Sequence, residues 1–143
     1  MSLQSSQPPV SGLDSLGRSA MKPVTVVVAI PDPNTNEALT SSLRSHFRVV
    51  LPTATFDEVR PSVLKHRADV VVLDLESTAM AEITPLLREF SALSVVCIHR
   101  LADYALWSSA LAAGAIDCCH PSDIRGIVMA VSRQGRIAQG HAA

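Results

Sequence analysis

The chain of 143 residues is long enough for one domain with a well-packed core and leaves little for a second. Hydrophobic residues make up 48% and charged residues 17%, a balance typical of a globular protein and not of a disordered one. The net charge of -1, without any run of Lys or Arg, gives no electrostatic footprint for nucleic acid, and no apolar stretch is long enough to span a membrane.

Residues 1–22 are rich in Ser, Gln, Pro and Gly without any period, and we interpret them as a disordered leader. They show no charged segment followed by an apolar one, so a secretory signal is not expected. The three cysteines, Cys97, Cys118 and Cys119, make no disulfide framework and have no Cys-x-x-Cys spacing. A reducing compartment such as the cytoplasm is the simplest setting, with the thiols packed as small hydrophobic groups.

From residue 23 onward, predicted strands and helices alternate five times. Apolar runs predict strands at 24–30, 47–51, 69–75, 94–99 and 115–119. Helices are predicted at 34–46, from Thr55 and Glu58 past Pro61, from Thr84-Pro85 onward, at 103–113 before Gly114, and after Ser122.

Short polar residues mark the predicted helix starts. Asn34 and Glu37 have the spacing of a capping box. Thr84 followed by Pro85 fits an N-cap and the first helical position, and Ser122 fits the N-cap of the last helix.

The order of these elements predicts the fold. Single helices between successive strands favour right-handed crossovers and a parallel sheet. The run at 69–75 is apolar without alternation, as in a strand covered on both faces. We therefore predict an α/β fold of the doubly wound (βα)5 type, a three-layer sandwich with the flavodoxin-like strand order 2-1-3-4-5. This domain is expected to span 23–138, with 139–143 as a tail or the start of a linker.

Polar side chains collect where the predicted strands end. Asp32 follows the first strand, and Asp74 with Glu76 ends the third. His99 ends the fourth strand, and His120 follows the fifth. Because ligands bind beyond the carboxyl ends of strands in open parallel sheets, Asp74 is the first place to look for chemistry.

The (βα)5 order, the single Asp74 closing the third strand and the Ala113-Gly114-Ala115 step before the fifth together resemble the receiver domain of response regulators in two-component signalling. The resemblance covers about residues 23–135. It implies a non-enzymatic signalling phosphoprotein whose aspartate takes a phosphoryl group from a sensor histidine kinase. It also implies a magnesium ion, held by that aspartate, by an acidic pair after the first strand and by a backbone carbonyl two residues past the aspartate.

Carried over by position, the metal-site match is partial. Asp74 stands at the phospho-acceptor position, and Glu76 at the position that supplies the carbonyl. Asp32 matches the second residue of the acidic pair, whereas Pro31 stands at the first. Mg²⁺ takes near-octahedral oxygen coordination with one or two carboxylates, so the loss of one acid is expected to weaken binding by Asp32, Asp74 and Glu76 without abolishing it.

Three further positions depart from the family pattern. His99 stands where a Ser or Thr is expected, His120 where a Lys is expected, and Cys118 where an aromatic switch residue is usual. A mostly neutral imidazole near pH 7 does not replace a Lys in cancelling phosphoryl charge. The resemblance is therefore to an atypical receiver domain, and whether Asp74 is phosphorylated stays open.

Trp107 is the only tryptophan, and in the receiver register it falls on the outer part of the fourth helix. The family uses this face for dimerisation and for docking output domains. Trp107 is therefore expected either to anchor an interface or to pack on its neighbours, Tyr104 and Leu111. The implied partners are a sensor kinase, an output domain or partner protein, and a second copy, without direct contact to nucleic acid or membrane. The kinase, the output and the oligomeric state stay open.

Two other functions remain open from the residues themselves. A small-ligand domain of the flavodoxin type shares the strand order, but the loop at 31–36 has no glycine and two prolines, a poor phosphate cradle. A regulatory metal site is the other, because His99 and His120 with Asp32 and Asp74 form a ligand set acceptable to zinc. A hydrolase using the two aspartates lacks a nucleophile paired with a base beyond these histidines.

Overall fold

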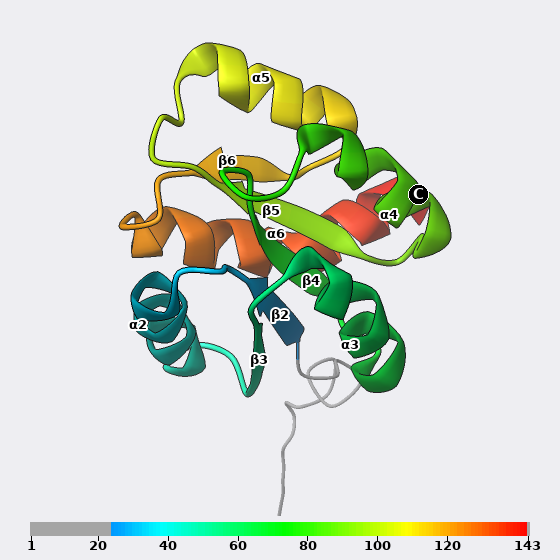
Figure 1. Cartoon of the computed structure of the whole chain (residues 1–143). Helices are drawn as coiled ribbons and strands as arrows, with labels where there is room; N and C mark the ends of the chain where they lie inside the picture. The colour runs from blue at the N-terminus through cyan, green and yellow to red at the C-terminus, as the bar shows by residue number, and fades with distance from the viewer. Residues whose placement is uncertain (1–23, 143) are drawn as a thin grey trace, which may run out of the picture.

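The computed structural model describes residues 24–142, with side chains described as far as residue 133, and contains a five-stranded parallel sheet (Figure 1). The strands are β2 (Thr25–Ala29), β3 (Val49–Thr53), β4 (Val70–Asp74), β5 (Ser94–Ile98) and β6 (Asp117–Cys119). They lie in the order β3-β2-β4-β5-β6, so the predicted doubly wound 2-1-3-4-5 order is confirmed. The predicted leader, residues 1–22, lies outside the described residues.

Helices cover both faces of the sheet (Figure 1). They are α2 (Pro33–Arg44), α3 (Val59–His66), α4 (Ile83–Glu89), α5 (Tyr104–Ala113) and α6 (Ile124–Ala142), with 3-10 turns η1 (Phe56–Glu58) and η2 (Met80–Glu82) before α3 and α4. Helices α2 and α6 pack on one face, and α3, α4 and α5 pack on the other. Within the described part of the chain, no helix combines the length and the apolar character that crossing a membrane requires.

The core explains why the strands show no alternation in sequence. In β2, Val26 and Val28 pack with α2 and α6, whereas Val27 and Ala29 pack with the three helices of the opposite face. Both sets are buried, since a parallel sheet covered by helices has no solvent-facing side. Burying each such valine contributes about 1.5–3 kcal/mol, so these strands are a large source of stability.

The start of α2 differs from the prediction. Asp32, and not Asn34, is the N-cap residue: its Oδ2 accepts a hydrogen bond from the backbone N of Thr35 at 3.0 Å. Pro33 takes the first helical position, where a missing N–H leaves nothing unsatisfied. The helix therefore begins one residue before Asn34, so Asn34 lies inside it and does not form a capping box with Glu37.

Two other predicted caps are also wrong. Thr84 lies inside α4, and its hydroxyl donates to the carbonyl of Ala113 at 2.9 Å. At the start of α6, Asp123 accepts from the backbone N of Gly126 at 3.0 Å, so Asp123 and not Ser122 serves the first turn. At α6 two short polar residues, Ser122 and Asp123, stand side by side in sequence, whereas the hydroxyl of Thr84 bonds to Ala113 of another helix and not to the start of its own.

The strand β3 lies two residues beyond the predicted 47–51 and includes Pro52. It is an edge strand that pairs only with β2, and there a proline without N–H is tolerated. The end of α5 follows the prediction, because Gly114 closes it at φ 116°. The positive φ at Gly114 favours glycine there, and a Cβ would also lie 2.7 Å from Leu87 Cδ1, so that this side chain would have to shift.

Candidate functional site

A hollow of about 470 Å³ lies at the carboxyl ends of β2, β4 and β5, and we refer to it as the strand-end hollow. It brings together Asp32, Asp74 and Glu76, the three residues that the sequence predicted as metal ligands. The complete lining is Ile30, Pro31, Asp32, Thr35, Asp74, Glu76, Ser77, Ile98, Arg100 and Pro121. Strand ends that are far apart in sequence thus meet at one edge of the sheet, as the doubly wound order requires.

Asp74 is the last residue of β4, and its side chain is half-buried. Its Oδ1 accepts from the backbone N of Glu76 at 2.9 Å, and the Ser77 hydroxyl lies 3.4 Å from Oδ2. Its backbone carbonyl accepts from the N–H groups of Ser77 and Thr78 at 3.3 and 3.0 Å. The turn after β4 therefore fixes the carboxylate at the mouth of the strand-end hollow.

Asp32 contributes the second carboxylate from the end of β2. Its Oδ2 accepts from both the backbone N and the hydroxyl of Thr35, at 3.0 and 2.5 Å. These hydrogen bonds, the one from the hydroxyl first, lower the pKa of Asp32. An acidic cap at the start of α2 engages an N–H group that a bound phosphate would use, which argues against the flavodoxin-type alternative.

Glu76 is held by Arg100, a residue that the sequence reasoning did not single out. Arg100 Nε lies 2.9 Å from Glu76 Oε1, Nη2 lies 2.7 Å from the same oxygen, and the Arg100 backbone N donates to Oε2 at 3.1 Å. The side-chain hydrogen bonds from Arg100 lower the pKa of Glu76 to about 2. Arg100 stands two residues past the end of β5. The expectation that ligands bind beyond the carboxyl ends of parallel strands, which identified Asp74, could therefore have identified Arg100 too.

The predicted phosphoryl-contact and switch positions lie outside the strand-end hollow lining. His99 Nδ1 accepts from the backbone N of Leu101 at 2.8 Å, and His120 Nδ1 accepts from the backbone N of Ser122 at 3.0 Å. Each imidazole thus closes a local turn. Cys118 is buried in the core, where burial raises the pKa of its thiol.

The donor set at the strand-end hollow does not fit a magnesium ion as it stands. Pro31 supplies no carboxylate, the Asp32 carboxylate is bonded to Thr35, and the Glu76 carboxylate is paired with a guanidinium. Among the residues that the structure describes, no three His, Cys, Asp or Glu side chains gather as a group able to hold a metal ion. That finding bears on the histidine-based zinc alternative, whereas the predicted magnesium site also uses a backbone carbonyl.

Trp107 lies on the exposed side of α5, with 37% of its surface accessible. Its Nε1 donates to Asp117 Oδ1 at 3.0 Å, and the other oxygen of Asp117 pairs with Arg133 Nη2 of α6 at 3.0 Å. Tyr104 stacks beside it with ring centroids 5.7 Å apart and remains largely exposed, as does Leu101. Trp107 therefore packs against its neighbours and also borders an exposed apolar surface, which we refer to as the α5–β6–α6 face.

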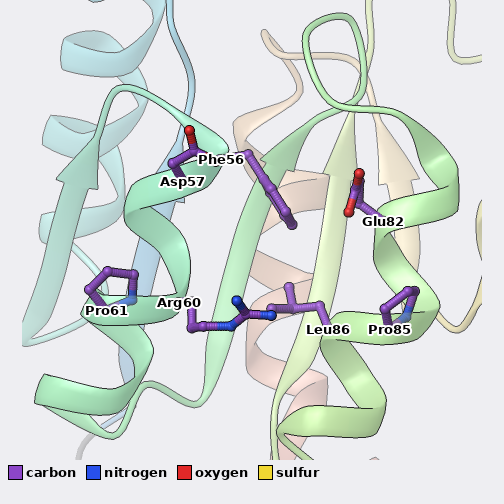
Figure 2. Close-up of a pocket in the computed structure, with 7 residues that line it drawn as sticks. All are labelled: Phe56, Asp57, Arg60, Pro61, Glu82, Pro85 and Leu86. Carbon is purple, nitrogen blue, oxygen red and sulfur yellow. The ribbon is translucent and has the colours of Figure 1, made fainter.

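A second hollow, of about 480 Å³, lies between α3 and α4 (Figure 2), and we refer to it as the α3–α4 hollow. Figure 2 shows Arg60 extending from α3 toward α4, with Phe56 and Leu86 also directed into the space between the two helices. Arg60 Nη2 pairs with Glu89 Oε1 at 2.7 Å. Two prolines, Pro61 and Pro85, and two carboxylates, Asp57 and Glu82, complete its wall.

Comparisons with known proteins agree on the fold. No protein-family model and no curated protein sequence matches the chain, whereas 154 chains of solved structures match its fold. The signal receiver domain of the response regulator NarL from Mycobacterium tuberculosis is 23% identical, with a TM-score of 0.66 over 78% of this chain and 95% of that one. The signal receiver domain of a DNA-binding response regulator from Colwellia psychrerythraea is 15% identical, with a TM-score of 0.70 over 79% and 98%.

A third similar structure carries a modified aspartate. It is a response regulator from Burkholderia pseudomallei, solved with a phosphorylated aspartic acid, a calcium ion and citrate. It is 17% identical, with a TM-score of 0.66 over 83% of this chain and 73% of that one. At these identities the likeness establishes the fold, so the predicted receiver-domain fold is confirmed.

Proposed function

We propose that the chain is a signal-transduction receiver module with Asp74 at the phospho-acceptor position. The observation that carries this proposal is the half-buried carboxylate of Asp74 at the end of the central strand β4, in a hollow shared with Asp32. The fold shared with receiver domains supports the same function. We propose a non-enzymatic module that is located in the cytoplasm and whose upstream partner is a sensor histidine kinase.

The module is atypical, because the groups that support phosphoryl transfer are replaced. Transfer depends on positioning and on cancelling charge over the phosphoryl oxygens. The positions of the usual hydroxyl and Lys hold His99 and His120, whose Nδ1 atoms are engaged in local turns. Pro31 removes a carboxylate and so weakens Mg²⁺ binding. We therefore expect the wild-type chain to accept phosphoryl groups poorly and to be regulated through protein contacts.

The α5–β6–α6 face is the contact surface that we propose. Asp117 bonds to both Trp107 and Arg133, so one carboxylate joins α5, β6 and α6. Tyr104 leaves apolar surface exposed next to the tryptophan, and Leu101, shortly before α5 in sequence, is exposed too. Aromatic anchors of this kind are enriched in interfaces, and the occupant is an output domain, a partner protein or a second copy in a homodimer.

Restoring the missing groups tests the assignment of Asp74. The restored variant is Pro31→Asp/His99→Thr/Arg100→Ala/His120→Lys, in which Arg100→Ala removes the guanidinium that is paired with Glu76. This variant and the wild type are incubated with Mg²⁺ and acetyl phosphate and examined by intact mass spectrometry. An Asp74 carboxylate oxygen attacks the phosphorus, the bond to the acetyl oxygen breaks and acetate leaves. We expect the restored variant to gain the mass of one phosphoryl group and the wild type to gain little.

The matched control adds Asp74→Ala to the restored variant, and circular dichroism verifies that each protein is folded. Loss of the adduct in the control supports Asp74 as the acceptor position. An adduct that persists without Asp74, or a folded restored variant that gains none, contradicts the proposed function. Trp107 fluorescence in the same samples reports whether the modification of Asp74 changes the surroundings of Trp107 on the α5–β6–α6 face.

A further inference from the structure

The ion pair between Arg100 and Glu76 forms part of the wall of the strand-end hollow. Glu76 lies in the turn after β4, and Arg100 lies in the loop after the neighbouring strand β5. The guanidinium contacts Glu76 through Nε and Nη2, and the backbone N of Arg100 binds the second carboxylate oxygen. The main chain and the side chain of Arg100 therefore both donate hydrogen bonds to the Glu76 carboxylate, which gives the pair a defined geometry.

This guanidinium also faces the two aspartates. Arg100 lines the same hollow as Asp32 and Asp74 and is the one Lys or Arg among the described residues that does so. Its bonds to Glu76, and more weakly the charges of Asp74 and Asp32, raise the pKa of Arg100, so it stays protonated. Three carboxylates thus line a hollow that holds one positive charge, and that charge is bonded directly to Glu76.

A fixed cation changes what else the hollow can bind. A divalent ion placed between Asp32 and Asp74 would lie next to a like charge. The Glu76 carboxylate would have to leave Arg100 before it could add a ligand to the backbone carbonyl expected from the same residue. Strong hydration of Mg²⁺ adds to this cost, because the ion gives up water only for well-placed oxygens. The disagreement between the donor set and a magnesium ion therefore has a specific cause.

We propose that Arg100 is the resident cation of the strand-end hollow and excludes divalent metal ions from it. This inference rests on the proposed function, because it concerns the same aspartates. It makes the charge balance of the hollow independent of Mg²⁺, so the module keeps one arrangement of its strand-end loops whatever the metal concentration.

Titration with Mg²⁺ alone tests the proposal, with calorimetry and the melting temperature as readouts and no phosphoryl donor present. Arg100→Gln removes the charge but keeps a hydrogen-bonding side chain for Glu76. We expect its Mg²⁺ affinity to be at least about tenfold higher than that of the wild type, with a melting temperature that rises as Mg²⁺ is added. Adding Asp74→Asn to Arg100→Gln is expected to remove the gain.

Arg60→Gln is the matched control, because Arg60 also pairs with a glutamate at 2.7 Å and is also largely exposed. It is expected to bind Mg²⁺ as weakly as the wild type. The proposal is overturned if the wild type binds Mg²⁺ as tightly as Arg100→Gln, if Arg60→Gln shows the same gain, or if the gain survives Asp74→Asn. Failure here leaves the phosphoryl adduct of the restored variant unaffected, so the two proposals can fail separately.

Discussion

The strand-end hollow and the α3–α4 hollow are nearly equal in size, at about 470 and 480 Å³. Each is lined by one arginine that pairs with a glutamate at 2.7 Å. Size and ion-pair length therefore do not distinguish them. The difference lies in which elements supply their walls.

The α3–α4 hollow is walled by two helices and the 3-10 turns before them. They supply two prolines, the apolar groups of Phe56 and Leu86, and three charged side chains, Asp57, Arg60 and Glu82. The strand-end hollow takes its charged groups from the ends of three strands, with Asp32, Asp74 and Arg100 contributed by different loops. Both hollows hold charges of both signs, but the strand-end hollow lies where the carboxyl ends of parallel strands meet, which is where ligands bind in such sheets. Chemistry is therefore expected at the strand-end hollow and packing at the α3–α4 hollow.

The largest expected contrast is in stability. Leu86→Ala at the base of the α3–α4 hollow removes a side chain that is only 3% exposed and is expected to lower the free energy of unfolding by about 2–5 kcal/mol. Asp74→Asn in the strand-end hollow is expected to change it by less than about 1 kcal/mol, because the half-exposed side chain keeps its size. Urea denaturation measures both. Equal losses would mean that the strand-end hollow is structural.

A smaller effect is expected from restoring the missing acid. In the Arg100→Gln background, Pro31→Asp adds a carboxylate to the strand-end hollow and is expected to tighten Mg²⁺ binding by about tenfold, measured by calorimetry. Pro33→Asp in the same background is the control, because Pro33 is exposed nearby but does not line this hollow. If both substitutions tighten binding equally, the gain comes from net charge and not from a ligand at position 31.

The fold could be predicted from the sequence because its main determinants are local. Uninterrupted valine runs separated by single helices specify a parallel sheet, and strands such as β4 were placed within one residue at each end. The errors arose where tertiary contacts choose between similar signals. Pro52 was expected to lie outside a strand but is accepted on an edge, and Thr84 bonds across to Ala113 instead of capping its helix.

The candidate site could be predicted only in part. Asp32, Asp74 and Glu76 were expected near one another because strand order alone brings them to one edge. Arg100 was missed, since its pairing with Glu76 depends on how two loops fold and not on any spacing along the chain. The orientations of the His99 and His120 side chains also depend on how their loops fold, because each imidazole accepts a hydrogen bond from the backbone N–H two residues later.

The smallest expected effect concerns acid stability. Arg100 lowers the pKa of Glu76 to about 2 from an ordinary value of 4.5, so the unfolded chain takes up this proton more readily than the folded one. The stabilisation is complete above pH 4.5 and is lost as the pH falls toward 2. In this window the melting temperature of the wild type is expected to fall more steeply than that of Glu76→Gln, by a modest amount because the pair is exposed. Arg100→Gln removes the guanidinium that lowers the pKa of Glu76, so the melting temperature of this variant is also expected to fall less steeply than that of the wild type. If the melting temperatures of the three proteins fall equally with pH, Arg100 and Glu76 do not form a stable ion pair in solution.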